Sequence, residues 1–258
     1  MSLRTRRSPC THSTSGQAGF TLAELATVMV ILGLLLGGLM MTLSTQLDVA
    51  RESETRKSFD TIREALIGYA ISRAGSVVLP CPDTNGDGLE EARVAGVCPS
   101  QEGWLPATTL GLSRSDPWGN RYRYRVDITF SSTTPPFTLA SVATPRVCQN
   151  NACTQILASN VPAVWVSHGP NGLGARGDGF VLHPQPTGVD ERGNTDGRNL
   201  PDTADTGTCS GGTTNLSCSF VSHEKRETAG TGGEFDDLVG WLPAPVLFNR
   251  LVAAGRLP

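Results

Sequence analysis

The chain has 258 residues, of which 17% are charged and 38% hydrophobic, and it contains 29 glycines and 17 prolines. So much glycine and proline excludes a mainly helical bundle, and the hydrophobic share is too low for a polytopic membrane protein. Residues 1–19 contain three arginines and no acid, so the net charge of −3 leaves −6 on the rest of the chain. Because no basic stripe is present to neutralise phosphates, we expect no nucleic-acid partner.

The first predicted element is residues 25–43, a run of 19 residues without a charge. Such a run is long enough to span a bilayer as one helix. The arginines before it and the mixed charges after it predict a cytoplasmic N-terminus, with the bulk of the chain on the other side of the membrane. The run is too long for the apolar core of an ordinary secretory signal, and no small-residue cleavage site follows it promptly.

One carboxylate, Glu24, lies inside the apolar block that begins at Phe20. An unpaired carboxylate is costly in hydrocarbon, so it needs a partner or a place at the interface. With its basic leader, the segment GFTLAELATVMVILGLLLGGLM resembles the class III signal of type IV pilins and type II secretion pseudopilins. The resemblance implies cleavage by a prepilin peptidase after Gly19 and methylation of the new amino terminus at Phe20. It also implies assembly through Glu24, paired with the amino terminus of a neighbouring subunit.

The helix is predicted to continue beyond the apolar run, from Phe20 to Ala74. Apolar residues recur there at helical spacing, and Gly75 is a suitable stop. The predicted organisation is a leader at 1–19, a transmembrane and assembly helix at 20–43, an amphipathic continuation at 44–75, and a globular domain at 76–258. The resemblance implies an α+β fold, in which the long helix packs on a small antiparallel β-sheet with long disulfide-stapled loops.

Six of the seven cysteines lie beyond residue 80 and fall into three local pairs. Short spacing favours disulfides formed in an oxidising compartment, although six cysteines also permit many other connectivities. Zinc is disfavoured, because no tight cluster of cysteine and histidine occurs. The favoured pairs are Cys81 with Cys98, Cys148 with Cys153, and Cys209 with Cys218.

Residues 79–98 contain a candidate calcium loop. Position twelve of such a loop is normally a glutamate, and here it is Val94, so Glu90 or Glu91 has to supply the missing carboxylate. The alternative is a glycine-rich turn whose Asp and Asn side chains cap their own backbone. The residues that match the opening of a calcium loop are Asp83, Asn85, Asp87 and Gly88.

The sequence DPWGN at residues 116–120 predicts a turn, and RYRYRVDITF after it alternates as an amphipathic strand does. The string DPWGN-x-Y-x-Y is similar to the major pseudopilin of type II secretion, in which it begins the sheet after the long helix. We expect Trp118 to anchor the core. The inward face of this strand is predicted to be Tyr122, Tyr124, Val126, Ile128 and Phe130.

The remaining elements are predicted from shorter patterns. Residues 182–233, rich in Thr, Gly, Asn and Asp, are interpreted as an inserted, irregular surface. Strands are expected at Ala163–Ser167, Phe180–Leu182 and Asp236–Leu242. A short C-terminal helix is expected with Val246, Leu247, Leu251 and Val252 facing inward.

The pseudopilin resemblance also implies a second calcium site, because that family binds calcium between a loop in this region and acids near the end of the chain. Candidate ligands at the matching positions are Asn171 and Asp178 together with Glu234, Asp236 or Asp237. The alternative for the two adjacent aspartates is a solvated strand edge that discourages pairing with other sheets. No cofactor other than calcium is expected.

The predicted function is structural. No catalytic motif occurs around the four histidines or the acids, so we expect no enzyme. The expected protein is a pilin or pseudopilin subunit, first single-pass in the bacterial inner membrane with a periplasmic domain, then part of a pseudopilus or a surface filament. Its expected partners are the prepilin peptidase and N-methyltransferase, other pilin or pseudopilin subunits, the inner-membrane assembly platform and the lipid bilayer.

Two questions of function stay open. The length and the cysteines favour a large minor subunit near a fibre tip, but they do not separate a secretion pseudopilus from a surface pilus. The alternative function is a signal-anchored periplasmic binding or enzymatic domain without filament assembly.

Overall fold

The computed structural model describes residues 19–177, 181–195, 219–226 and 233–257, without the side chains of residues 36–45. The chain divides into two compact units, Met1–Leu47 and Asp48–Pro258. The leader, apart from Gly19, lies outside the described residues.

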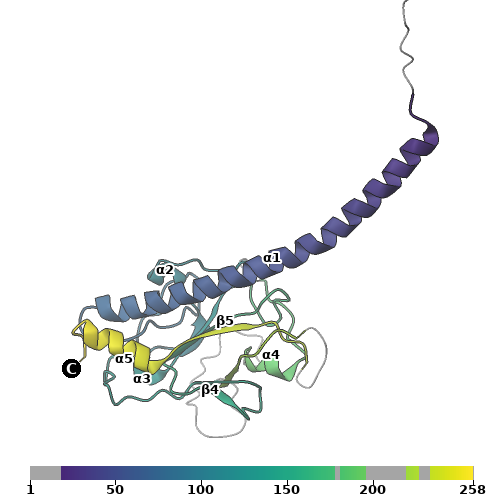
Figure 1. The fold of residues 1–258 in the computed structure, drawn as a ribbon. Coiled ribbons are helices and arrows are strands. Elements are labelled where there is room, and N and C mark those ends of the chain that lie inside the picture. The colour runs from purple at the N-terminus through teal and green to yellow at the C-terminus, as the bar shows by residue number, and fades with distance from the viewer. Residues whose placement is uncertain (1–18, 178–180, 196–218, 227–232, 258) are drawn as a thin grey trace, which may run out of the picture. The chain divides into compact units, whose positions relative to one another are not determined.

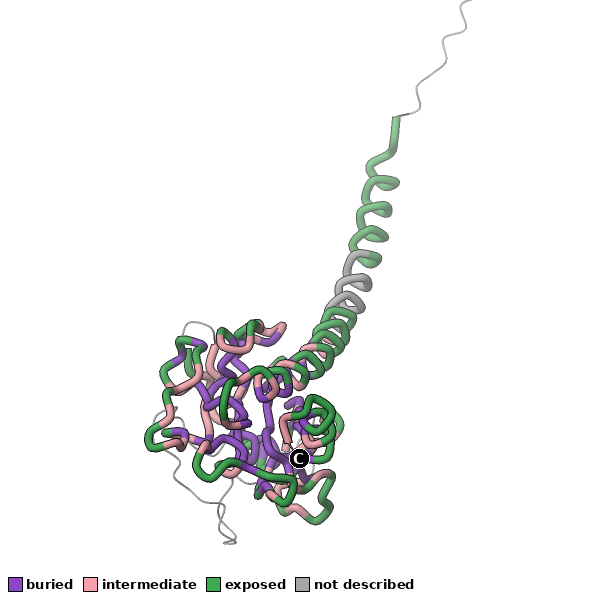
Figure 2. Tube along the Cα trace, turned by 90° about the vertical axis from the view of Figure 1, so that its left-hand side faces the viewer, coloured by how far each residue is buried: buried purple, intermediate pink, exposed green. Residues whose placement is uncertain are grey.

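Helix α1 spans Leu22–Ser72 and confirms the long helix, with ends two residues inside the predicted ones. In the first unit every described side chain of residues 19–35 is exposed, as the green trace in Figure 2 shows. The last part of the predicted membrane span, residues 36–43, falls where side chains are not described. Within the described residues, no helix combines the length and the apolar content needed to cross a membrane.

The second unit is built around a four-stranded antiparallel sheet in the order β1-β2-β5-β7, of which β5 is labelled in Figure 1. Strand β5 lies inside this sheet, where Trp165 faces Tyr124 of β2 on one side and Gly240 of β7 on the other. The strands are β1 Glu102–Trp104, β2 Arg123–Val126, β5 Ala163–Ser167 and β7 Leu238–Leu242. The antiparallel sheet is therefore confirmed, and β5 coincides with the strand predicted from AVWVS.

Alternation along β5 explains how it is buried on both faces. Ala163 and Trp165 belong to a core with the second half of α1 and with α5, which spans Ala244–Ala253. Val164 and Val166 belong to a second cluster on the opposite face of the sheet. Burying one such side chain fully contributes about 1.5–3 kcal/mol. The larger core includes Phe59, Ile62, Leu66, Tyr122, Tyr124, Trp165, Leu242, Leu247 and Leu251.

A second sheet, in the order β4-β3-β6, covers this opposite face through Phe220 of β6. Its strands are β3 Arg146–Cys148, β4 Ile156–Ala158 and β6 Ser219–Val221, and β6 runs parallel to β3. The interpretation of residues 182–233 as irregular surface is therefore wrong for part of the segment. This segment supplies β6 and a short helix, α4 Val189–Gly193, and Phe220 is buried.

Two predicted patterns of burial are corrected. The strand expected to reach Phe130 ends at Val126, because Asp127 accepts a hydrogen bond from the Thr129 amide and starts the helical turn α3, Ile128–Ser131. In α5 the inward residues are Leu247 and Leu251, whereas Val246 and Val252 are exposed. Residue 180 of the strand expected at Phe180–Leu182 lies outside the described residues. Leu182 forms only an isolated bridge with Arg176.

The DPWGN turn forms as predicted. The Asp116 carboxylate accepts hydrogen bonds from the amides of Trp118 and Asn120, at 3.0 and 2.9 Å. Gly119 has φ +87°, a conformation that favours glycine. Trp118 packs partly buried against the main core, in agreement with its expected packing role.

Two of the three predicted disulfides form, Cys81–Cys98 and Cys148–Cys153. The third pair, Cys209 and Cys218, lies outside the described residues. The Cys81–Cys98 loop is fastened to the end of α1 by Glu90, which pairs with Arg73 at 2.9 Å and with Arg93 at 3.1 Å. Short helix α2, Ala107–Leu110, follows β1.

Candidate functional site

The start of α1 holds the predicted processing and assembly residues. Gly19 and Phe20 precede the helix, and the Phe20 side chain is 88% exposed. The Glu24 carboxylate accepts hydrogen bonds from the amide and the hydroxyl of Thr21, both at 2.9 Å, and the Thr21 hydroxyl accepts from the Glu24 amide. This reciprocal arrangement is a capping box, a role for Glu24 that the Thr-x-x-Glu spacing signals and that our sequence analysis missed.

In the first candidate calcium loop, the side-chain oxygens accept hydrogen bonds from donors within the loop itself. Both carboxylate oxygens of buried Asp83 accept backbone hydrogen bonds, from Gly86 at 2.6 Å and Gly88 at 2.7 Å. Asn85 and Asp87 cap the amides two residues ahead of them in the same way. Glu91 accepts from Thr84. This geometry favours the self-capped turn over a common set of ligands.

At the second candidate calcium site, three carboxylates lie close together. Glu191 of α4 comes together with Asp236 and Asp237, which precede β7, so that one ligand atom from each lies within 4.8 Å of the others. The side chains are deeply buried, with exposed fractions of 1%, 5% and 5%. Sequence analysis predicted the two aspartates and missed Glu191, because it interpreted the segment around it as surface. Asp178 lies outside the described residues.

Polar neighbours outside the cluster contact all three carboxylates. Asn171 donates from its amide to Asp236 and from its side chain to Glu191, both at 2.9 Å. Asp237 accepts from Asn194 at 2.9 Å and lies 3.3 Å from His168 Nδ1. These contacts confirm that Asn171 adjoins the predicted acids, and they use one oxygen of Asp236 and one of Glu191.

The other oxygen of each of these two acids receives no such hydrogen bond. Glu191 Oε2 and Asp236 Oδ1 are buried and accept no hydrogen bond from any described residue. Burial, followed by the negative charge of Asp237, raises the pKa of Glu191 to about 8. Burial also raises the pKa of Asp236 to about 6. Two such oxygens need a proton or a cation between them, since buried like charges repel.

The comparisons with known proteins bear on the N-terminal segment. Residues 14–40 match the family model described as the prokaryotic N-terminal methylation motif. The chain therefore carries a type IV pilin-like prepilin N-terminal segment, the class of segment that is processed at its N-terminus. The match contains Gly19, Phe20 and Glu24. No curated protein and no solved structure matches the chain.

Proposed function

We propose that the chain is a structural subunit of a type II secretion or type IV pilus-like filament, acting by assembly rather than catalysis. The observation that carries the proposal is the register of Gly19, Phe20 and Glu24 inside the methylation motif. The exposed side chains of residues 19–35 support it, because an apolar helix whose described side chains are exposed is suited to packing against other subunits.

In this proposal the subunit is held in the inner membrane by the apolar run before assembly. A prepilin peptidase cleaves it on the cytoplasmic side and methylates Phe20, and an assembly platform then adds it to a fibre of pilin or pseudopilin subunits. The globular unit lies in the periplasm or at the cell surface. Its size and its disulfides favour a minor subunit near the fibre tip.

Processing is tested on the full chain co-expressed with its own prepilin peptidase. We expect intact-mass measurement and N-terminal sequencing to find a chain that starts at N-methylated Phe20. The variant Gly19→Arg is expected to stay uncleaved and serves as the control. A wild-type chain that starts at Met1, or that is cut beyond Leu43, would instead support the anchored periplasmic domain.

We also propose that Glu191, Asp236 and Asp237 hold a divalent cation, with calcium as the expected ion. Two buried carboxylate oxygens, which accept no hydrogen bond from the amides or other donors of the described residues, support this proposal. Calcium prefers oxygen ligands and tolerates irregular geometry, so the three carboxylates suit it better than they suit zinc. The ion would tie the segment carrying α4 to the end of the chain that carries β7.

Calcium is expected to raise the melting temperature at pH 8 and to change it little at pH 5. Without a cation, the raised pKa values of Glu191 and Asp236 mean that the folded state holds protons that the unfolded state releases. These protons stabilise the folded state fully when the pH is below the pKa values that the two acids have in the unfolded chain. This stabilisation is lost as the pH rises through the folded-state pKa values, about 6 for Asp236 and about 8 for Glu191. At a concentration a hundredfold above its Kd, calcium should raise the melting temperature at pH 8 by roughly 5–10 °C.

The measurement is thermal unfolding of the full chain in EDTA and in calcium at both pH values. Glu191→Gln should lose the calcium response and show a shallower decline with pH. Asp87→Asn, in the self-capped loop, should keep the calcium response and is the matched control. An unchanged wild-type melting temperature on adding calcium at pH 8 would refute the cation site.

A further inference from the structure

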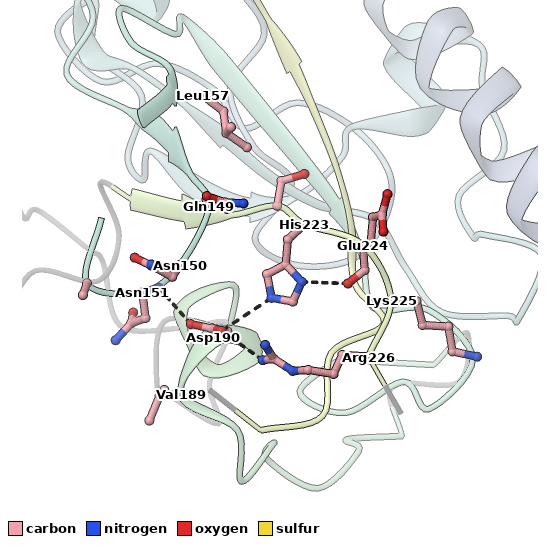
Figure 3. Close-up of a pocket in the computed structure, with 12 residues that line it drawn as sticks. Gln149, Asn150, Asn151, Leu157, Val189, Asp190, His223, Glu224, Lys225 and Arg226 are labelled. Atoms are coloured by element: carbon pink, nitrogen blue, oxygen red, sulfur yellow. Dashed lines mark hydrogen bonds and ion pairs between the residues drawn. The ribbon is translucent and has the colours of Figure 1, made fainter. Parts of the chain in front are cut away.

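A second polar site lies in the globular unit, in a cavity of about 1030 Å³ (Figure 3). Three segments line it: the loop at residues 149–152 with Leu157, the start of α4 at Val189 and Asp190, and residues 222–226 after β6. None of these residues takes part in the N-terminal processing segment or in the acidic cluster. A cavity of this size can hold a ligand of several rings.

The walls of the cavity are held together around one buried carboxylate, as the dashed lines in Figure 3 show. Asp190 accepts a hydrogen bond from the Asn151 amide at 2.9 Å and pairs with Arg226 at 3.1 Å. His223 Nε2 lies 3.4 Å from the same carboxylate, and its ring stacks on Phe235. The Cys148–Cys153 disulfide closes the loop. The site is therefore formed before any ligand arrives, which lowers the entropic cost of binding.

The charges of the lining argue against an anionic ligand. Asp190 and Glu224 balance Lys225 and Arg226. Arg226 and His223 already contact Asp190, and Lys225 has an interaction partner of its own. An anion would have to compete with Asp190 for these cations, and it would also meet the exposed carboxylate of Glu224.

The backbone of the loop argues against a peptide that pairs with β3. The amides of Gln149 and Cys153 donate within the loop region, to Gln155 and Asn150, and the Asn151 amide donates to Asp190. Strand β3, which leads into the loop, has β4 on one side and β6 on the other. A peptide that binds by adding a strand would find no free edge on β3.

The groups left for recognition are two neutral amides and the Glu224 carboxylate, beside apolar surface. The side chains of Gln149 and Asn151 make no hydrogen bond to any described residue, and each can donate and accept. Leu157 and Val189 are 44% and 50% exposed beside them. Sugar rings match this lining, because their hydroxyl groups donate and accept while their C–H faces are apolar.

We propose that this cavity binds a short neutral oligosaccharide. Gln149 contributes hydrogen bonds to the sugar hydroxyls, and Leu157 contacts a ring face. This binding activity is separate from filament assembly, and its test does not depend on the processing of the N-terminus.

The test uses the full chain in a zwitterionic detergent without a sugar headgroup. It is applied to an array of neutral and sialylated oligosaccharides, and the best glycan is then titrated calorimetrically. We expect neutral glycans to bind, and Gln149→Ala to weaken binding about tenfold, as the loss of one good hydrogen bond does. Val142→Ala, an exposed apolar position outside the cavity lining, should bind as the wild type does.

Both variants change exposed side chains, so equal melting temperatures are expected to show that the fold is intact. Three outcomes would overturn the proposal: no neutral glycan binds, only sialylated glycans bind, or Gln149→Ala binds a neutral glycan as tightly as the wild type. An acidic peptide included in the titration should not bind. Peptide binding that Gln149→Ala weakens would assign the cavity to peptides instead.

Discussion

Glu24→Ala is expected to abolish filament assembly while cleavage after Gly19 persists. In the proposed fibre, the Glu24 carboxylate pairs with the methylated amino group of Phe20 on a neighbouring subunit, inside an apolar seam. Removing one partner of a buried charge pair costs about 3–5 kcal/mol, because the other charge stays buried without compensation. Fibre yield, measured by shearing and electron microscopy, should therefore fall at least about a hundredfold.

The capping box makes a second variant necessary. The alanine variant removes both the charge and the hydrogen bonds from Thr21 to Glu24. Glu24→Gln removes the charge and keeps a side chain that also serves in capping boxes, so it separates the two roles. We expect Glu24→Gln to fail in assembly as well, whereas Glu52→Ala, an acid later in α1, should assemble normally. Abundant fibres from Glu24→Gln would contradict the charge pairing and leave capping as the role of Glu24.

Gly240→Ala is expected to destabilise the globular unit by about 3 kcal/mol, near the upper end for overpacking a core. Gly240 lies on β7 beneath α1, and a Cβ placed there would be 2.1 Å from Trp165 Nε1 and 2.8 Å from Phe59 Cδ2. Both rings belong to the main core, where they meet edge to face. Neither ring can move aside without disturbing neighbours that are themselves buried.

Urea unfolding of the full chain measures this effect, and Gly68→Ala provides the matched control. A Cβ at Gly68, within α1, meets no other atom within 4 Å. Alanine there should raise the free energy of unfolding by about 0.5–1 kcal/mol, because glycine is the weaker helix former. If Gly240→Ala were as stable as the wild type, the close packing of α1 on β7 would be refuted.

The sequence predicts the elements that follow from local patterns. The helical stripe through Phe59, Ile62 and Leu66 places α1 on the sheet, and AVWVS marks β5 residue for residue. The DPWGN turn and the two observed disulfides follow from residue types at short spacing. Each of these signals lies within a stretch of the chain shorter than about twenty residues.

The errors arise where a distant or competing contact decides the structure. Alternation alone carries the predicted strand past Asp127, whose carboxylate caps a helical turn and also accepts from Thr144, 17 residues later. Glu191 looks like a surface acid in its own segment and becomes buried only because Asn171 and the end of the chain meet it. No local sequence pattern indicates contacts between such distant segments, so the place of Glu191 in the acidic cluster could not be predicted.

The central position of β5 also sets the order in which the globular unit can be completed. The strand pairs with β2, which precedes it in the chain, and with β7, which ends at Leu242. The core beneath it joins Phe59 to Leu251, so its first and last members are separated by most of the unit. During synthesis from the N-terminus these contacts form only when nearly the whole chain has emerged. Until then the face of α1 that carries Phe59 lacks its final cover, and such exposed apolar surface favours aggregation.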